Sequence, residues 1–165
     1  MNAIFHRTSV RNFLDKTIES EKVEQILRAA MQAPTAGNQR PCEYYVINNK
    51  DILEQLATVS PYAGPVAKAP MAIVVCYKNT GLRFQEYAQI DSAIVSENIL
   101  LEIDALGLGA VFLGIAPLED RMEAVRKILN LPSNLDAFNI IPFGYPTKES
   151  KQQDRFESSR VHYVN

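Results

Sequence analysis

Two short segments of the sequence carry residue types that suit a ligand with a charged end and a flat ring. In the first segment, Arg7 and Arg11 bracket the hydroxyl side chain of Ser9. A guanidinium group donates hydrogen bonds in a planar fork that matches phosphate oxygens, and a hydroxyl adds a further donor. We therefore interpret this segment as a site for a phosphate monoester.

The second segment, residues 33–41, is rich in small residues and prolines. It follows a helical pattern and precedes a strand-like run. Because few large side chains hold it away, its backbone can approach a planar ring closely. A phosphate site and a ring site together match flavin mononucleotide (FMN), which has both parts.

The composition is that of a globular protein. The chain has 165 residues, a formal net charge of -2 and no long run of one charge sign. Nucleic acid or an anionic membrane as the main partner would call for a basic patch, so neither is expected. The length fits a single domain over residues 1–165.

Other sequence features bear on location and on cysteine chemistry. The N-terminal residues lack the apolar stretch of a signal peptide, so a cytoplasmic protein is expected. Cys42 and Cys76 lie too far apart for a metal-type or redox pair, and we expect reduced, buried thiols. The longest apolar-rich stretch, residues 88–106, contains acidic side chains, which excludes a membrane span. These are Asp91, Glu97, Glu102 and Asp104.

Hydrophobic periodicity predicts several helices. One begins with Ser20 as its N-cap and is ended by Pro34. Another, over residues 86–106, is apolar nearly all round and ends at an αL Gly107, so we place it at the centre of the molecule. The remaining predicted helices are residues 2–8, residues 51–58 with Asp51 or a neighbour as cap, and Pro117 to Asn130. The central helix also carries polar residues that we expect to be buried with hydrogen-bond partners, namely Tyr87, Glu97 and Asn98.

Strand patterns alternate with these helices. Residues 71–77 are apolar throughout, which is typical of a strand covered on both faces. Residues 59–70 are rich in proline and form a loop. The other predicted strands are residues 43–48, 110–114 and 136–143, with an extended segment over residues 10–14.

The C-terminal part of the chain differs in composition. Residues 147–160 are almost wholly polar and cannot pack on themselves. They lead to residues 161–164, whose alternation predicts a strand that needs a sheet edge. We therefore interpret residues 150–165 as an arm that reaches another protomer.

Alternating helices and strands alone would favour a doubly wound parallel sheet. A dinucleotide fingerprint, however, lies between a strand and a helix, whereas Gly107 and Gly109 precede a strand. We therefore reject a Rossmann dinucleotide site and interpret these glycines as a helix cap and a strand entry.

Taken together, the segments resemble the nitroreductase family of FMN-dependent oxidoreductases, specifically its small members. The matches occur in the family's order and extend over almost the whole chain. Residues 7–11 resemble its Arg-x-Ser-x-Arg/Lys phosphate motif, and residues 33–41 its Ala-Pro-Ser-x-x-Asn-x-Gln-Pro loop. Residues 107–114 are similar to its Gly-x-Gly-x-x-Trp-x-Gly strand, residues 141–146 to its Pro-x-Gly-Tyr-Pro end, and residues 154–156 to its basic tail.

The resemblance implies an α+β fold, an α/β/α sandwich around a central mixed sheet. It also implies an intertwined homodimer with two FMN sites at the interface. Backbone groups near Leu113 and Gly114 would face the ring edge. The implied phosphate and ribityl contacts are Arg7, Thr8, Ser9, Arg11 and Arg155. The implied ring contacts, supplied by the opposite protomer, are Pro34, Thr35, Ala36 and Asn38.

The chain departs from the family pattern at several positions. Arg40 stands where the family has Gln before the proline, and Cys42 where Trp usually follows it. Phe112 replaces the Trp of the glycine strand, and Gln153 a frequent Lys in the tail. The segment between the central helix and the next strand is too short for the helices that cover the substrate in larger members.

The leading hypothesis is an oxidoreductase that uses bound FMN to pass hydride from NADH or NADPH to nitroaromatic, quinone or similar small acceptors. Donor and acceptor would use one site in turn, by a ping-pong mechanism. No side chain is expected to act as a catalytic acid or base and no metal is expected, because the cofactor carries the reaction. The alternatives are a flavin reductase or specialised flavin-dependent dehydrogenase, and a non-enzymatic FMN carrier.

Overall fold

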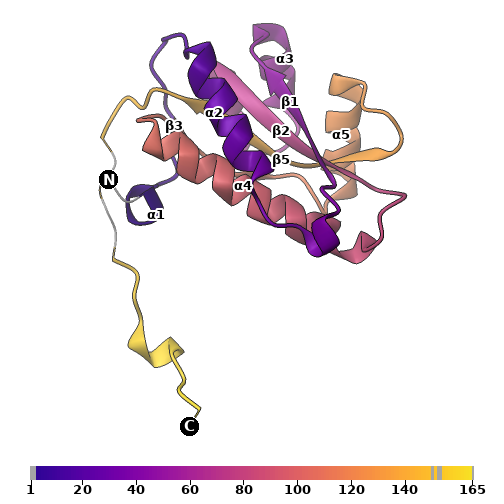
Figure 1. Cartoon of the computed structure of the whole chain (residues 1–165). Coiled ribbons are helices and arrows are strands. Elements are labelled where there is room, and N and C mark those ends of the chain that lie inside the picture. Colours follow the sequence, from indigo (N-terminus) through magenta and orange to yellow (C-terminus); the bar gives the residue numbers. More distant parts are fainter. Residues whose placement is uncertain (1–2, 150, 152–153, 165) are drawn as a thin grey trace.

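The computed structural model describes residues 3–149, 151 and 154–164, and Gln153 lies outside this part of the chain. A five-stranded sheet forms its centre (Figure 1). The strands are β1 (Cys42–Ile47), β2 (Met71–Lys78), β3 (Gly109–Ala110), β4 (Leu113–Gly114) and β5 (Leu135–Gly144). Their order is β1-β2-β5-β3, and β4 also pairs with β5. All these pairings are antiparallel, and an isolated parallel bridge joins Ser9 to Ala110.

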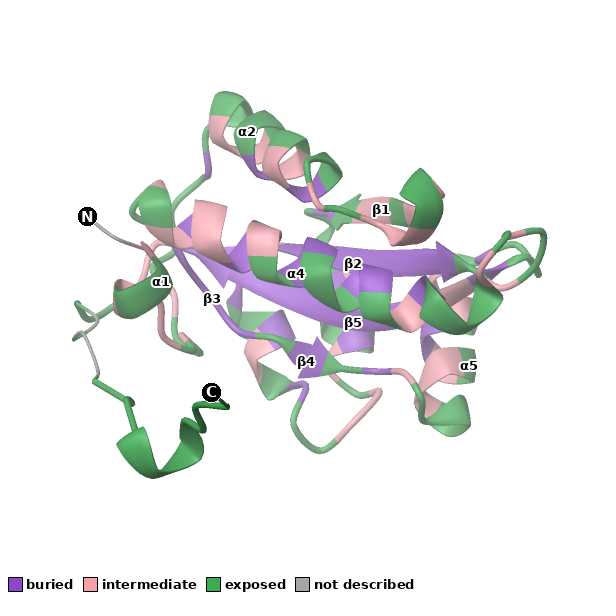
Figure 2. Ribbon diagram, turned by 60° about the horizontal axis from the view of Figure 1, so that its bottom comes forward, coloured by how far each residue is buried: buried purple, intermediate pink, exposed green. Residues whose placement is uncertain are grey.

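Helices cover both faces of the sheet, so the sandwich is confirmed (Figure 2). The helices are α1 (Ala3–His6), α2 (Ser20–Met31), α3 (Lys50–Leu56), α4 (Ala88–Ala105) and α5 (Glu119–Leu129). Short 3₁₀ turns are η1 (Ala36–Asn38), η2 (Gly64–Lys68), η3 (Gln85–Tyr87) and η4 (Ser158–Arg160). None of the described helices is long and apolar enough to cross a membrane.

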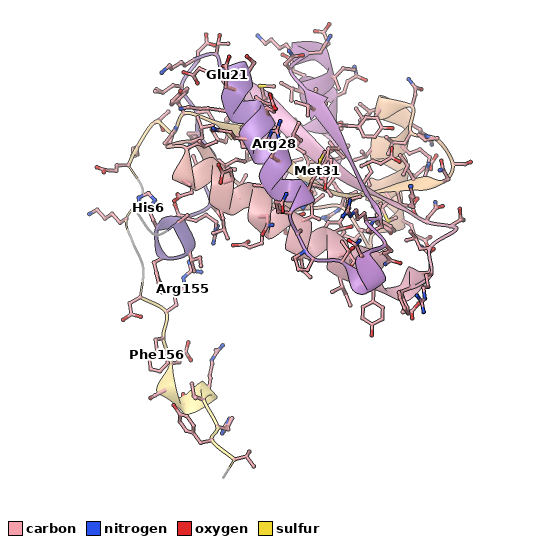
Figure 3. The ribbon with its side chains drawn as sticks, in the orientation of Figure 1. His6, Glu21, Arg28, Met31, Arg155 and Phe156 are labelled. Atoms are coloured by element: carbon pink, nitrogen blue, oxygen red, sulfur yellow. The ribbon has the colours of Figure 1, made fainter. Side chains whose placement is uncertain are left out.

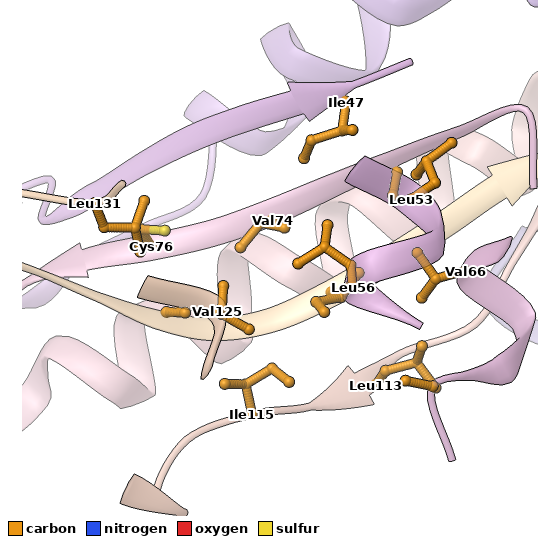
Figure 4. Packing of buried hydrophobic residues seen from close by; sticks show 14 of the residues in the cluster. Ile47, Leu53, Leu56, Val66, Val74, Cys76, Leu113, Ile115, Val125 and Leu131 are labelled. Carbon is orange, nitrogen blue, oxygen red and sulfur yellow. The ribbon is translucent and has the colours of Figure 1, made fainter. Parts of the chain in front are cut away.

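The alternation of β2 explains why both faces are covered. Ile73 and Val75 join the core cluster beneath α2 and α4. Val74 and Cys76 point the opposite way, into a cluster that includes Leu56 of α3 and residues of α5 (Figure 4). Successive side chains of a strand alternate between faces, so a strand buried on both is apolar throughout.

α4 has the predicted central position, but its polar residues are distributed differently from the prediction. Tyr87 is 45% exposed and the Glu97 side chain 54% exposed, so the prediction that they are buried is wrong. Asn98 is half-buried and donates to the carbonyl of Ala29, as predicted. The fully buried polar side chains of α4 are instead Asp91, Ser92 and Ser96.

One face of α4 is apolar and uncovered in the single chain. Tyr87, Ile90 and Ile94 are 45%, 54% and 38% exposed. Their spacing of three and four residues places them on one side of the helix. We call these residues the α4 stripe.

Several element boundaries differ from the prediction for local reasons. The predicted strand 110–114 is divided into β3 and β4, because the opposing Pro142 has no N–H to donate to the ladder. α2 has Glu19 rather than Ser20 at its N-cap, and that carboxylate accepts from the Tyr145 hydroxyl. α5 begins at Glu119, two residues after Pro117.

Other predicted ends are confirmed. Gly107 follows α4 with a φ of +75°, the αL conformation that glycine adopts without steric cost. The N-cap of α3, by contrast, is Asn49, two residues before the predicted Asp51, and its side chain accepts from the backbone N–H of Ile52. The loop predicted over residues 59–70 contains only the short turn η2.

Residues 154–164 of the C-terminal arm lie away from the body of the protein (Figure 3). The strand predicted over residues 161–164 is not formed in the single chain, where these residues are exposed and irregular. A lone strand has no partner for its backbone groups, which explains the absence. Phe156, Tyr163 and Val164 are 75%, 86% and 97% exposed.

A buried carboxylate positions the second segment, residues 33–41, which we call the proline loop. Asp91 is 2% exposed, and its Oδ1 accepts from the backbone N–H of Ala36 at 2.9 Å. Its Oδ2 accepts from the side-chain amide of Gln39 at 2.8 Å. Gln39 also bridges to the backbone of Phe84 on the other side. Asp91 lies in the first turn of α4, where the helix dipole favours a negative charge.

Replacing Asp91 with Asn should loosen the proline loop without unfolding the protein. The amide keeps the volume but loses the charge-assisted acceptors, a change of about 1–3 kcal/mol. Hydrogen exchange at residues 35–40 should accelerate, and the melting temperature should fall by roughly 2–10 °C. Asp120→Asn is the control, because Asp120 is an exposed first-turn acid on α5. Equal exchange in the two variants would show that Asp91 does not hold the loop.

Candidate functional site

The predicted phosphate segment, residues 7–11, lies against β3. The backbone N–H of Val10 donates to the carbonyl of Ala110 at 2.8 Å, and Ser9 forms its parallel bridge with the same residue. Gly109 permits this approach, because a Cβ atom there would lie 2.6 Å from Cγ2 of Val10. The glycine predicted as a strand entry therefore also seats the phosphate segment.

His6, just before this segment, and Arg7, its first residue, both contact α4. Nδ1 of His6 lies 2.9 Å from each carboxylate oxygen of Asp104. Nε of Arg7 lies 3.6 Å from Oε1 of Glu97. Arg7 therefore faces α4 in the single chain, and it does not line the hollow that its neighbours form.

That hollow, of about 320 Å³, carries a concentration of positive charge, and we call it the cationic hollow. Arg11, Lys148 and Lys151 contribute positive charges and Glu149 a negative one. The full lining is Thr8, Ser9, Val10, Arg11, Asn12, Thr147, Lys148, Glu149 and Lys151. Three of the four predicted N-terminal contacts thus share one hollow, while Arg155 lies on the arm outside it (Figure 3).

Sequence reasoning missed Lys148 and Lys151. These lysines reach the hollow because two segments distant in the sequence pair with each other. Phe13 bridges to Pro146, and the N–H of Leu14 donates to the carbonyl of Tyr145 at 2.8 Å. Since the extended N-terminal segment pairs with residues 145–147, the residues that follow must run beside the phosphate segment.

Arg11 also lines a second hollow, of about 440 Å³, at the β4 edge of the sheet. We call it the sheet-edge hollow. Leu113 is buried and Gly114 is exposed there, and the Gly114 carbonyl accepts from Nη1 of Arg121 at 3.3 Å. The full lining is Arg11, Ser60, Tyr62, Pro65, Val111, Phe112, Leu113, Gly114 and Arg121. The structure therefore brings the predicted phosphate residue Arg11 to the predicted ring-edge residues.

The proline loop is a separate part of the candidate site. Pro34 and Asn38 are exposed, whereas Thr35 and Ala36 are half-buried. Gly37 has a φ of +53°, and a Cβ atom there would lie 2.5 Å from the ring of Phe84. Glycine at this position lets the loop fold tightly over Phe84 and turn its exposed side chains to solvent.

The proline loop and the sheet-edge hollow lie at opposite edges of the sheet. The loop leads directly into β1, one edge strand, and the hollow adjoins β4, beyond β5. Figure 2 shows β1 and β4 on either side of β2 and β5, with α4 across them. Three strand spacings separate the two edges, about 14 Å. A single chain does not bring these two groups of predicted residues together.

The thiols are not poised for chemistry. Burial raises the pKa of the Cys42 thiol to about 11 and that of Cys76 to about 12. Both are free, as predicted, and both are protonated at neutral pH; Cys76 is buried as predicted, whereas Cys42 is only half-buried. A larger hollow of about 730 Å³, lined partly by Lys16, Lys50 and Lys68, contains none of the predicted site residues.

Comparisons with known proteins agree with this architecture. Residues 4–61 and 61–145 match the sequence pattern of the Nitroreductase family. A candidate NADH dehydrogenase/NAD(P)H nitroreductase of Methanothermobacter thermautotrophicus is 38% identical over 162 residues, which cover 98% of this chain and 85% of the relative.

Solved structures show the same fold. A candidate NADH oxidase from Clostridium acetobutylicum superposes with a TM-score of 0.95 at 42% identity, covering 99% of both chains. A candidate nitroreductase from Desulfovibrio desulfuricans, solved in complex with FMN, has a TM-score of 0.80 at 26% identity. It covers 99% of this chain and 95% of its own. With a family match over most of its length and these relatives, the chain belongs to the nitroreductase family.

Proposed function

We propose that this protein is an oxidoreductase that binds FMN and passes electrons from NADH or NADPH to nitroaromatic, quinone or similar small acceptors. The observation that carries the proposal is the position of Arg11, which lines both the cationic hollow and the sheet-edge hollow. A ligand that spans the two would place an anion at one end and a flat group at the other.

The donor set of the cationic hollow fits a phosphate. Arg11 and the two lysines supply charged donors, and the hydroxyls of Thr8 and Ser9 supply neutral ones. Arg11 makes no ion pair with any described carboxylate, and its Nη1 donates only weakly, at 3.4 Å, to the Ser9 carbonyl. Such a cluster of cations is favourable when it faces an anion of up to two charges.

The sheet-edge hollow fits the ring. Phe112, Tyr62 and Pro65 give it flat apolar walls, and Gly114 exposes backbone without a side chain. Sites of this kind are mostly apolar with a few placed polar groups. We propose that the ring edge lies along Leu113 and Gly114 and that Arg155 closes on the phosphate from the arm.

We propose that a second copy of the chain supplies the proline loop, with Pro34, Thr35, Ala36 and Asn38 on the ring. The separation of loop and hollow in one chain supports this. The α4 stripe supports it too, because an exposed apolar helix face favours a partner. β1 pairs only with β2 among the described strands, so its outer edge can accept residues 161–164 of the partner.

Bound FMN supplies hydride transfer from the nicotinamide and onward reduction of the acceptor. The protein's part is to hold the phosphate with Arg11 and the lysines, to fix the ring edge with the backbone of β4, and to shield the ring with the proline loop. The thiols stay protonated and take no part. Without a dinucleotide fingerprint, the donor and the acceptor occupy the same exposed ring face in turn.

The first test concerns the phosphate. Arg11→Gln should weaken FMN binding by roughly ten- to a hundred-fold, the cost of one charge-assisted hydrogen-bond set. Flavin fluorescence during titration of the apoprotein measures this, and riboflavin, which lacks the phosphate, should bind far less well than FMN. Arg28→Gln is the control, because Arg28 pairs with Glu24 on the exposed face of α2. A protein that cannot be loaded with FMN would refute the proposal.

The second test concerns the dimer. Removing residues 150–165 should shift the protein toward monomer and lower its FMN content, and removing only residues 161–165 should weaken the dimer while keeping Arg155. The intact interface should exceed roughly 2,000 Å². Light scattering at micromolar concentration measures the assembly state. A monomer that holds one FMN per chain would contradict the shared site.

The third test concerns the order of events. Double-reciprocal plots at several acceptor concentrations should be parallel, because the donor product leaves before the acceptor binds. Cys42→Ala and Cys76→Ala should lower kcat by well under the roughly 10²-fold expected for a lost acid or base. Intersecting lines would instead indicate separate donor and acceptor sites.

A further inference from the structure

Arg40 has an unusual conformation in the proline loop. Its φ is +47°, a region that residues other than glycine rarely adopt. Among the described residues, only Asn38 and Asn130 share this property, and Asn130 is the C-cap of α5. The two remaining cases are two residues apart in the same loop. Such backbone conformations persist where the surroundings fix them, and they cluster at functional sites.

The loop itself fixes the Arg40 side chain. Its backbone N–H donates to Oγ1 of Thr35 at 3.1 Å, and its Nε donates to Oδ1 of Asn38 at 3.1 Å. Only the second of these bonds involves the guanidinium group, and it holds the side chain against Asn38. The Nη atoms have no partner among the described residues, and no described carboxylate pairs with Arg40. Arg28 and Arg126, in contrast, are ion-paired.

Arg40 is one of the residues that line a small cavity. Its volume is about 240 Å³, and its lining is Ala30, Met31, Ala33, Thr35, Arg40, Pro41, Cys42, Tyr44 and Val95. An apolar cavity of about 150 Å³ holds benzene, so this one has room for a substituted single ring. Burial raises the pKa of Cys42 to about 11 and that of Tyr44 to about 12, so at neutral pH Arg40 is its only charged lining residue.

We propose that Arg40 and this cavity select acceptors that consist of one aromatic ring with a carboxylate or similar anionic substituent. The cavity takes the ring, and the free Nη edge of Arg40 binds the anion. This inference rests on the proposed function, in which the proline loop covers the flavin ring. Because Thr35 and Arg40 line the cavity, an acceptor held there lies beside that loop.

The donors of the Arg40 guanidinium group account for a preference among acceptors by their charge rather than by their size. A guanidinium group that presents two donors side by side matches a carboxylate, and its orientation is already fixed by Asn38. A neutral amide of the same shape cannot accept both bonds in this way. The family's Gln at this position would supply a neutral side chain, so the preference belongs to this chain's own residue.

Binding tests this without turnover. Benzoate and benzamide are titrated calorimetrically into the FMN-loaded protein. Arg40→Gln should weaken benzoate by about tenfold and leave benzamide unchanged. The benzoate affinity of Arg40→Lys should lie between those of the native protein and Arg40→Gln, because lysine keeps the charge and loses the planar fork. Arg28→Gln, which removes an exposed charge from α2, should resemble the native protein.

Reoxidation of the reduced protein gives a second measurement. The flavin is reduced by light without nicotinamide and mixed with 4-nitrobenzoate or 4-nitrobenzamide. The rate of reoxidation by 4-nitrobenzoate, divided by the rate with 4-nitrobenzamide, should be about tenfold lower in Arg40→Gln than in the native protein. Arg40→Met, a second uncharged variant, guards against a folding defect in the first, and rates are normalised to bound flavin.

The outcomes separate the two proposals. A native protein that lacks FMN or fails to reduce 4-nitrobenzamide contradicts the proposed function. If 4-nitrobenzamide is reduced but the anion preference is the same in native protein, Arg40→Gln and Arg40→Met, the role of Arg40 is wrong. The proposed role of Arg40 would also be wrong if Arg40→Gln changed only the rate of flavin reduction by NADH or NADPH. Arg40 would then recognise an anionic group of the electron donor rather than of the acceptor.

Discussion

The order of the strands constrains everything else in this protein. β1 lies at one edge of the sheet, and β3 and β4 lie at the other. β2, β5 and α4 therefore separate the proline loop, which precedes β1, from the two hollows beside β3 and β4. No loop movement of a few ångströms closes a gap of about 14 Å across packed strands. Under the proposed dimer, this separation would account for two exposed features of the single chain, the α4 stripe and the C-terminal arm.

α4 supports both the proline loop and the N-terminal residues that lead into the phosphate segment. Asp91 near its start holds the proline loop, and Asp104 near its end holds His6 ahead of the phosphate segment. About 20 Å of helix separates these carboxylates at 1.5 Å per residue. A packed helix transmits position without bending, so two segments distant in sequence are fixed relative to one another. On one side the helix packs against the sheet through Val95, Ile99 and Ile103, while on another side the α4 stripe stays exposed in the single chain.

Much of this could be predicted from the sequence, and the failures have physical causes. Periodicity located the central helix and the doubly covered strand, and Gly107 marked a helix end, because those signals are local. The division of β3 from β4 depends on Pro142 in the opposing strand, which a local pattern cannot show. Lys148 and Lys151 reach the candidate site only through pairing between residues 13 and 146. The sequence pattern does not distinguish Asp91 from an exposed helix acid, because its partners, Ala36 and Gln39, lie more than 50 residues away in the chain.

The cationic hollow also illustrates why composition alone hides a site. The chain has a net charge of -2, yet Arg11, Lys148 and Lys151 face one hollow with a single carboxylate among them. Grouped like charges repel, so this arrangement reduces stability unless an anion occupies the hollow. A ligand that binds only the folded form stabilises it in proportion to its saturation. Under the proposed function, a phosphate bound in this hollow would therefore also stabilise the fold, because the cations would then face an anion as well as one another.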